Sequence, residues 1–450
     1  MTIAIIGLGY VGLPLCLQFA RSGVRVLGLD IDPRKVQALN AGRSYIKHIP
    51  AAEIGKYVRQ GKFLASSDFS LIGRTRWRRE TKKSETPHVV SGASEEVAAV
   101  LICVPTPLKR NREPDLSYVL KTGESVARHL RKGQVIVLES TTYPGTTENE
   151  LREVLERGSG LQAGRDFHLA FSPEREDPGN PDRRLSEIPK VIGGYTPACL
   201  DAAKKIYRKA IGKIVPVANC RTAEAAKLLE NIFRSVNIAL VNELKTVYGA
   251  MEIDIWDVIA AARTKPFGFM PFYPGPGLGG HCIPIDPFYL AWQARRFGQQ
   301  TRFVELAGEI NTAMPEKVAA RLAQALASEK KKLRGARVLI LGLAYKANVD
   351  DDRESPSYVL MNLLTRRGAE VFYFDPHIPV IRPSREHSHW AGTRSVKWNR
   401  KTIASFDAVL ISTAHDAVNY RQLGRWARLI VDTRNVMADV KAKRENIWKA

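Results

Sequence analysis

The N-terminal stretch carries the pattern that most constrains how this chain folds. The apolar run Ile3-Ala4-Ile5-Ile6 suits a buried parallel strand, and it leads straight into the glycine turn Gly7-Leu8-Gly9-Tyr10-Val11-Gly12. A helical pattern follows the turn, and a second strand-like run over residues 24–29 ends at Asp30. A strand, a glycine turn and a helix in this order let a pyrophosphate approach bare backbone at a helix N-terminus, while the spaced acid accepts a ribose hydroxyl. The sequence therefore predicts a dinucleotide-binding Rossmann domain.

The residues next to the turn indicate which dinucleotide this domain takes. The Asp30 carboxylate would repel the 2′-phosphate of NADP, so the pattern favours NAD. Arg34 and Lys35 lie close behind Asp30 in the sequence and keep NADP open as the alternative. The predicted cofactor-binding residues of this segment are Gly7, Gly9, Tyr10, Val11, Gly12, Asp30 and Lys35.

Three more strand-like runs follow at residues 100–104, 135–138 and 167–171, with helical patterns between them. This alternation predicts an α/β domain with a parallel sheet. Each run ends in a polar segment, and such sheets bind ligands at the carboxyl ends of their strands. We therefore expect the polar segments to line one site. They are Pro105-Thr106-Pro107, Ser140-Thr141-Thr142 and Ser172-Pro173-Glu174-Arg175.

A long helix is predicted from Thr222 onward, with Thr222 as its N-cap and Glu224 in its first turn. Lys227 and Asn231 are four residues apart and share one face, which suits two hydrogen-bond donors aimed at one oxygen. An apolar stripe predicts that another face bridges two domains or pairs with its copy in a dimer. The stripe consists of Leu229, Phe233, Val236, Leu240, Leu244 and Val247.

A glycine-rich loop precedes one cysteine in the segment Gly275-Pro276-Gly277-Leu278-Gly279-Gly280-His281-Cys282. The glycines leave the backbone bare for the close approach of a ligand. Asp286 follows Cys282 at a spacing that places both on one face of a helical turn. Taken alone, a single cysteine of this kind fits either a catalytic nucleophile or a buried, inert thiol.

A second α/β module follows two helical patterns that meet at Pro315. Its strand-like runs are residues 337–342, 370–375, 408–412 and 429–432. The segment Gly342-Leu343-Ala344-Tyr345-Lys346 lacks the three-glycine turn of a dinucleotide site. We expect this module to bind another phosphorylated ligand through Lys346 and Arg434.

Composition narrows the class of protein. The five cysteines form no Cys-x-x-Cys pair, which argues against a disulfide framework or a structural zinc ion and for a reducing cytosol. No apolar run is long enough to span a membrane. The net charge of +22 favours phosphorylated or polyanionic partners, but no nucleic-acid-binding motif accompanies it. A basic segment at about residues 73–92 is interpreted as an exposed insertion.

These features together resemble the UDP-glucose/GDP-mannose dehydrogenase family over nearly the whole chain. The resemblance rests on residues 7–12, 172–175, 224–231, 275–286 and 342–353. Within the family, residues 266–274 and the Gly-Gly-His-Cys segment are most similar to the branch that oxidises UDP-N-acetylhexosamines, with UDP-N-acetylglucosamine favoured. The family normally has a shorter connection where this chain has its basic segment.

The resemblance implies an α/β fold with two Rossmann-like doubly wound domains joined by a central long-helix region. The NAD-binding domain would cover residues 1–198, the central dimerisation and catalytic region 199–315, and the UDP-sugar-binding domain 316–450. The implied partners are a UDP-sugar and a second copy of the chain, without a membrane or a specific nucleic acid.

The implied reaction is an NAD-dependent, four-electron oxidation of a sugar C6 alcohol to a carboxylate. By resemblance Cys282 is the nucleophile, Lys227 and Asn231 stabilise negative charge on the C6 oxygen, Asp286 and Thr141 position water, and Glu174 lines the site. Further cofactor contacts would come from Pro105, Thr106, Thr141 and Arg353. Substrate contacts would come from Glu174, Arg175, Lys227, Asn231, Phe272, Tyr273, Gly275, Gly279, Lys346 and Arg434.

Several alternatives remain open at this point. Within the family, the substrate could be UDP-glucose, UDP-N-acetylmannosamine or GDP-mannose. A two-electron hydroxyacid dehydrogenase of similar layout would need no cysteine. A basic nucleic-acid-binding protein on a dehydrogenase scaffold would bind RNA in a salt-dependent way and form no NADH.

Overall fold

The computed structural model describes residues 1–46, 49–73, 96–109, 111, 113–175, 187–280, 285–384, 387–440 and 446–450. Two compact units make up the chain. The first contains Met1–Leu229 and Arg295–Phe297, and the second contains Glu230–Ala294 and Gly298–Ala450. Cys282 and most of the basic segment at residues 73–92 lie outside the described residues, so the expectations for them stay predictions.

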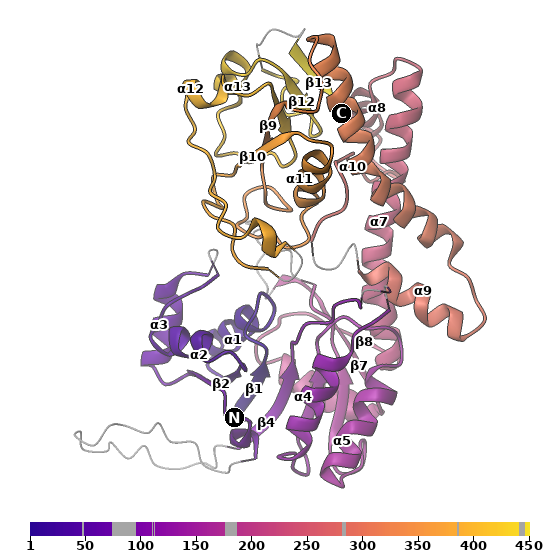
Figure 1. Cartoon of the computed structure of the whole chain (residues 1–450). Helices are drawn as coiled ribbons and strands as arrows, with labels where there is room; N and C mark the ends of the chain where they lie inside the picture. The colour runs from indigo at the N-terminus through magenta and orange to yellow at the C-terminus, as the bar shows by residue number, and fades with distance from the viewer. Residues whose placement is uncertain are drawn as a thin grey trace. The chain divides into compact units, whose positions relative to one another are not determined.

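The described part of the first unit is built on one eight-stranded sheet in the order β3-β2-β1-β4-β5-β6-β7-β8. Six strands pair in parallel, whereas β7 pairs antiparallel with β6 and parallel with β8. This arrangement confirms the α/β prediction (Figure 1). The strands are β1 (Thr2–Ile6), β2 (Arg25–Leu29), β3 (Phe63–Ser66), β4 (Val97–Ile102), β5 (Val135–Leu138), β6 (His168–Phe171), β7 (Lys190–Gly194) and β8 (Ile214–Val217).

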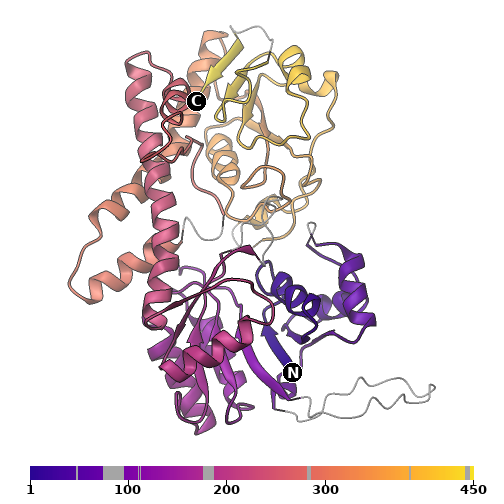
Figure 2. The ribbon, with the colours of Figure 1, turned by 180° about the vertical axis from the view of Figure 1, so that it is seen from behind.

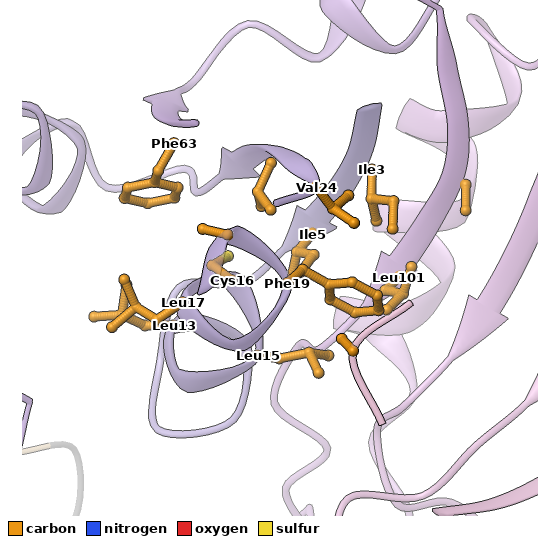
Figure 3. Packing of buried hydrophobic residues seen from close by; sticks show 14 of the residues in the cluster. Ile3, Ile5, Leu13, Leu15, Cys16, Leu17, Phe19, Val24, Phe63 and Leu101 are labelled. Carbon is orange, nitrogen blue, oxygen red and sulfur yellow. The ribbon is translucent and has the colours of Figure 1, made fainter. Parts of the chain in front are cut away.

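Helices cover both faces of this sheet, and its central strands are therefore buried on both sides. Figure 3 shows α1 beside β1, with Phe19 of the helix next to Ile5 of the strand; Leu15 and Ile3 belong to the same buried cluster. The helical elements of the unit are α1 (Gly12–Arg21), α2 (Pro33–Asn40), α3 (Ala51–Arg59), η1 (Phe69–Ile72), α4 (Ser117–Ala127), the π-helical turn η2 (Thr147–Leu151), α5 (Arg152–Ser159) and α6 (Pro197–Tyr207).

The long helix α7 (Cys220–Ala250) begins in the first unit and ends in the second. The prediction that Thr222 is its N-cap is wrong, because the helix starts at Cys220 and the Asn219 side chain does the capping. The Asn219 Oδ1 atom accepts a hydrogen bond from the Thr222 backbone N–H at 2.8 Å. On the predicted apolar stripe, Leu229, Phe233, Leu240 and Val247 are 67%, 47%, 52% and 40% exposed, whereas Val236 and Leu244 are half-buried.

The second unit holds a sheet of five described strands in the order β10-β9-β11-β12-β13, all parallel. Figure 2 shows β13 at the edge of this sheet, beside the C-terminus. The strands are β9 (Arg337–Leu341), β10 (Glu370–Phe374), β11 (Ala408–Ile411), β12 (Ile430–Asp432) and β13 (Ile447–Lys449). The helices are α8 (Ile255–Ala262), α9 (Asp286–Arg296), α10 (Arg302–Ser328), α11 (Pro356–Arg366), η4 (Ser388–Trp390), α12 (Arg400–Ile403) and α13 (Tyr420–Trp426).

The helix α10 runs through Pro315, where the sequence predicted two separate helical patterns. Proline inside a helix removes one backbone hydrogen bond and costs about 3 kcal/mol. Burial of Met314 and Val318 on either side of Pro315 offsets this cost. In the part of the chain that the structure describes, no helix is both long and apolar enough to cross a membrane.

Candidate active site

The glycine turn between β1 and α1 has one open position and two closed ones. A Cβ atom on Gly7 would lie 2.3 Å from the Cys103 carbonyl oxygen, and one on Gly12 would lie 2.0 Å from the Gly7 carbonyl oxygen. A Cβ atom on Gly9 would meet nothing within 4 Å among the residues that the structure describes. Gly7 and Gly12 therefore let backbone segments pack together, whereas Gly9 leaves space at the helix N-terminus. That space fits a pyrophosphate group.

This difference predicts that one alanine substitution lowers stability and that the other weakens NAD binding. Gly12→Ala should lower the melting temperature, because its Cβ clashes with backbone that cannot rotate away, and such overpacking costs about 1–3 kcal/mol. Gly9→Ala should leave the melting temperature unchanged and weaken NAD binding. Thermal unfolding and NAD titration of the two variants check this. A Gly9→Ala protein that binds NAD as tightly as the wild type would contradict the assignment of this space to the cofactor.

Asp30 lies at the end of β2 and is 6% exposed. Its Oδ2 atom accepts a hydrogen bond from the Leu8 backbone N–H at 2.9 Å and lies 3.1 Å from the Lys35 Nζ atom. Arg34 instead pairs with Asp32, at 3.1 Å between Nη2 and Oδ2. Arg34 and Lys35 are the two cations that could attract the 2′-phosphate of NADP, and each is paired with a carboxylate. This pairing favours NAD as the cofactor.

The three polar segments meet at one edge of the first sheet, since β4, β5 and β6 are neighbours and run in parallel. The Ser140 hydroxyl donates to the Val104 carbonyl oxygen at 2.7 Å and so joins the second segment to the residue that precedes the first. Pro105 is exposed, and Thr106 and Thr141 are half-buried. The Arg175 Nη1 atom donates to the Pro189 carbonyl oxygen at 2.8 Å.

Glu174 belongs to a buried ionic cluster that the sequence did not reveal. The Lys190 Nζ atom lies 3.2 Å from Glu174 Oε2 and 2.5 Å from Glu139 Oε2, and the Tyr207 hydroxyl donates to Glu139. Burial raises the pKa of the Glu139 carboxyl. Burial alone would lower the pKa of Lys190, but the charges of Glu139 and Glu174 outweigh it and raise this pKa.

Glu224 fastens α7 to the segment that follows Thr141. Its carboxylate accepts hydrogen bonds from the Gly145 N–H at 2.6 Å, the Thr147 N–H at 3.0 Å and the Thr147 hydroxyl at 2.7 Å. Burial raises the pKa of Glu224 to about 7, although these hydrogen bonds act in the opposite direction. Lys227 follows Glu224 on α7, so this anchor fixes the part of the helix that carries Lys227.

In the second unit, the Asn231 Nδ2 atom donates a hydrogen bond to Asp286 Oδ2. Asp286 opens α9 and is 2% exposed. Lys227 is half-buried and lies four residues before Asn231 on α7, on the same helix face. The structure thus joins two residues that were selected for separate roles in the sequence, next to the segment that holds Cys282.

The glycine loop before Cys282 is packed more closely than its sequence suggests. The Gly275 N–H donates to the Asn242 Oδ1 atom at 3.0 Å, and a Cβ on Gly275 would lie 2.7 Å from the Arg434 Nη1 atom. A Cβ on Gly279 would lie 2.8 Å from Pro356 Cδ. At these two positions glycine makes room for protein side chains, whereas the sequence indicated backbone left bare for a ligand.

The other predicted substrate residues take varied positions in the second unit. The Phe272 ring meets Phe233 edge-on with 5.6 Å between centroids, and the Tyr273 ring stacks on Trp256 at 5.7 Å. Lys346 is half-buried after β9.

Two arginines of the second unit have defined partners. The Arg434 Nε atom donates to the Ser412 carbonyl oxygen at 2.8 Å, and burial lowers the pKa of Arg434 to about 10. A guanidinium held in so dry a position is suited to a phosphate group. The Arg353 Nη2 atom pairs with Asp351 Oδ2 at 2.7 Å, and its contact with the cofactor stays a prediction.

Comparison with known proteins identifies the family. The profile of the UDP-glucose/GDP-mannose dehydrogenase NAD binding domain matches residues 1–74 and 77–211, that of the central domain matches 221–313, and that of the UDP binding domain matches 339–439.

Individual proteins agree with this assignment. UDP-N-acetyl-D-glucosamine 6-dehydrogenase of Pseudomonas aeruginosa is 32% identical over 98% of both chains. UDP-N-acetyl-D-mannosamine dehydrogenase of Escherichia coli K12 is 36% identical over 84% of this chain and 86% of its own. The structure of a UDP-D-ManNAc dehydrogenase from Pyrococcus horikoshii superposes with a TM-score of 0.83 at 31% identity, covering 100% of this chain and 99% of that one. The chain belongs to the UDP-glucose/GDP-mannose dehydrogenase family and is an NAD-dependent oxidoreductase of the nucleotide-sugar 6-dehydrogenase type.

Proposed function

We propose that this enzyme oxidises the C6 alcohol of a UDP-N-acetylhexosamine, with UDP-N-acetylglucosamine favoured, to the uronic acid used in polysaccharide or lipopolysaccharide precursors. The hydrogen bond from Asn231 to Asp286 carries the proposal, because it brings an amide donor and a carboxylate together beside the Cys282 segment. The Gly-Gly-His-Cys segment and relatives that act on UDP-N-acetylglucosamine or UDP-N-acetylmannosamine support this branch of the family.

The proposed reaction proceeds in three chemical steps. The sugar would lose a hydride from C6 and the proton of its hydroxyl group, giving an aldehyde. The Cys282 thiolate would then attack the carbonyl carbon, and the carbonyl oxygen would take up a proton to complete a thiohemiacetal. Loss of a second hydride from C6 to a second molecule of NAD, together with loss of the hydroxyl proton, would then convert the thiohemiacetal to a thioester. Water finally attacks the thioester carbonyl, forming a C–O bond and breaking the C–S bond. The carboxylate is released and the thiolate of Cys282 is restored.

The side chains of this site have distinct proposed roles in these steps. Lys227 and Asn231 would donate hydrogen bonds to the C6 oxygen while it carries negative charge, as in an oxyanion hole. Asp286 and Thr141 would hold the attacking water, and Glu174 would line the site. Bound NAD supplies the hydride acceptor, and the open position at Gly9 and the Asp30 carboxylate would hold it.

We assign residues 1–198 to the NAD-binding domain, 199–315 to the central region and 316–450 to the UDP-sugar-binding domain. In the last domain Lys346 and Arg434 would bind the substrate, and the dry position of Arg434 supports its contact with the diphosphate. The exposed part of the α7 stripe, which includes Phe233 and Leu240, supports association of two copies. The scattered cysteines support a cytosolic site of action.

Initial rates of NADH formation with a panel of nucleotide sugars test the proposed substrate. We expect kcat/KM for UDP-N-acetylglucosamine or UDP-N-acetylmannosamine to exceed that for UDP-glucose and GDP-mannose by at least about 100-fold, since a site built to bind the acetamido group discriminates against sugars that lack it. Higher kcat/KM for UDP-glucose would place the enzyme in another branch of the family.

A further inference from the structure

The glycine turn after β9 is built like the one after β1. Gly342 and Gly7 each directly follow their strand, with φ angles of 87° and 91°. Asp375 follows β10 as Asp30 follows β2, and β9 and β10 are parallel neighbours, as are β1 and β2. Each carboxylate accepts a hydrogen bond from the backbone N–H after the glycine, at 2.7 Å for Asp375 and 2.9 Å for Asp30. The second unit therefore carries the strand, the turn and the acid of a dinucleotide site, without its second and third glycines.

The Asp375 carboxylate has taken over a different task from its counterpart in the first sheet. Its side chain is 0% exposed. Besides the N–H after Gly342, it accepts hydrogen bonds from the N–H groups of Ala344 at 3.0 Å, His377 at 2.7 Å and Ile378 at 3.1 Å, and from the His415 Nε2 atom at 3.0 Å. A carboxylate offers about four acceptor positions, so these contacts occupy it fully. Asp375 therefore holds the protein's own chain, whereas the acid of a dinucleotide site accepts a ribose hydroxyl.

His415 connects Asp375 to the far end of the segment that begins at Gly342. Its side chain is fully buried, and its Nδ1 atom accepts a hydrogen bond from the Asn348 backbone N–H at 3.0 Å. An amide N–H can only donate, so the ring proton lies on Nε2, which donates to the carboxylate. Burial alone would raise the pKa of Asp375, but the hydrogen bonds from His415 and from backbone N–H groups outweigh it and lower this pKa. The carboxylate is therefore ionised and keeps its hydrogen bond from His415.

Lys346 lies within this segment, which is held on both sides of it. Two backbone N–H groups before Lys346 bind Asp375, and the Asn348 N–H after it binds His415. All four residues belong to the second unit. A short segment held at both ends gives the side chain between them a narrow range of positions, which reduces the conformational entropy that is lost when a ligand binds.

We propose that His415 is a positioning residue for Lys346, because by joining Asp375 to Asn348 it holds the segment in the shape that presents the lysine to the diphosphate of the substrate. An ammonium group binds phosphate as a point charge, so the strength of this contact depends on where the backbone holds the lysine. The inference rests on the proposed function, in which Lys346 binds the substrate.

Two substitutions that each keep one contact of His415 test the inference. In His415→Asn the amide oxygen takes the place of Nδ1 and still accepts from Asn348, whereas in His415→Gln the amide nitrogen takes the place of Nε2 and still donates to Asp375. Titration calorimetry of the full chain with UDP should give a Kd about 5–10-fold above wild type for His415→Gln and within about threefold of it for His415→Asn. The Kd for NAD should stay unchanged in both. Equal UDP affinity in the two variants, or weaker binding in His415→Asn, overturns the inference.

A double-mutant cycle with Lys346→Met shows whether His415 acts through the lysine. Lys346→Met alone should raise the Kd for UDP by about 10-fold or more, because it removes a charged donor. Adding His415→Gln to this variant should raise the Kd no further, since the lysine that His415 positions is gone. If the two effects add in free energy, the positioning role is overturned and the proposed function stands. Unchanged UDP affinity in Lys346→Met would remove Lys346 from the proposed function and the inference with it.

Asn348→Gly loosens the same segment from the surface of the protein and decides the matter if the His415 variants do not fold, as melting temperatures show. The Asn348 Nδ2 atom donates to Asp416 Oδ2 at 2.7 Å, and its Oδ1 atom accepts from the Asp416 N–H at 3.0 Å. Glycine deletes both contacts and readily adopts the φ of 65° at this position. The variant should therefore fold and raise the Kd for UDP by about threefold. An unchanged Kd would overturn the inference.

His389→Ala is the matched control for the loss of a histidine from the second unit. His389 is exposed, and its Nε2 atom lies 2.8 Å from Asn362 Oδ1, outside the segment that carries Lys346. This variant should keep wild-type affinity for UDP. A loss as large as that in His415→Gln would show that the effect is not specific to His415, and would overturn its positioning role.

Discussion

Replacing Cys282 with alanine should lower kcat for the complete oxidation to the uronic acid by a factor on the order of 10³ or more, because the covalent intermediate can no longer form. The thiolate is required for both the thiohemiacetal and the thioester. NAD binding should be unchanged, since the glycine turn and Asp30 belong to the first unit. Steady-state formation of NADH and of the uronic acid, together with NAD titration, checks this prediction.

Cys199→Ala is the matched control for the cysteine substitution. Cys199 is a free, fully buried cysteine on α6, and its removal should leave kcat within about twofold of the wild type, because the substitution of a buried structural cysteine affects packing and not chemistry. A Cys282→Ala enzyme that retains full activity would favour the two-electron hydroxyacid dehydrogenase and contradict the covalent mechanism.

Replacing Asn231 with alanine should lower kcat by about 10²–10³-fold, the usual loss when one oxyanion donor is removed. The same substitution deletes the hydrogen bond to Asp286, so the carboxylate proposed to hold water loses its orientation as well. The KM for NAD should stay unchanged. Steady-state kinetics with a saturating UDP-N-acetylhexosamine measure the effect.

Asn237→Ala provides the control on the same helix. The Asn237 side chain donates to the Phe233 carbonyl oxygen at 2.7 Å, a contact within α7. This variant should retain wild-type kcat, which would show that loss of an asparagine from α7 does not itself impair the enzyme. An Asn231→Ala enzyme within about threefold of wild-type kcat would remove Asn231 from the oxyanion role.

Sequence patterns located nine of the thirteen described strands, each a short apolar run next to a glycine or a polar residue, and missed β3, β7, β8 and β13. The run predicted at residues 3–6 is β1 (Thr2–Ile6), and the run at 135–138 coincides with β5. The glycine turn and Asp30 were recognisable because their function depends on local spacing. Features that depend on neighbouring residues in this way can be predicted from the sequence alone.

The errors and omissions arose where contacts over long sequence distances decide the outcome. Lys190 is ordinary in sequence, and only the antiparallel register of β7 brings it to Glu174 and Glu139. The glycine at position 275 indicated open backbone. In the structure, the side chain of Arg434, a residue distant in sequence, occupies the space beside it. The wrong N-cap at Thr222 had a local cause, since Asn219 is an equally suitable cap a few residues earlier.

The yield of NADH from a limiting amount of UDP-N-acetylhexosamine tests the central claim most directly. With excess NAD, the reaction should form about two NADH per sugar, because two hydrides leave the same carbon before water releases the product from Cys282. The uronic acid should appear in equal amount to the sugar consumed. A yield of one NADH per sugar, with an aldehyde as the final product, would contradict the four-electron mechanism.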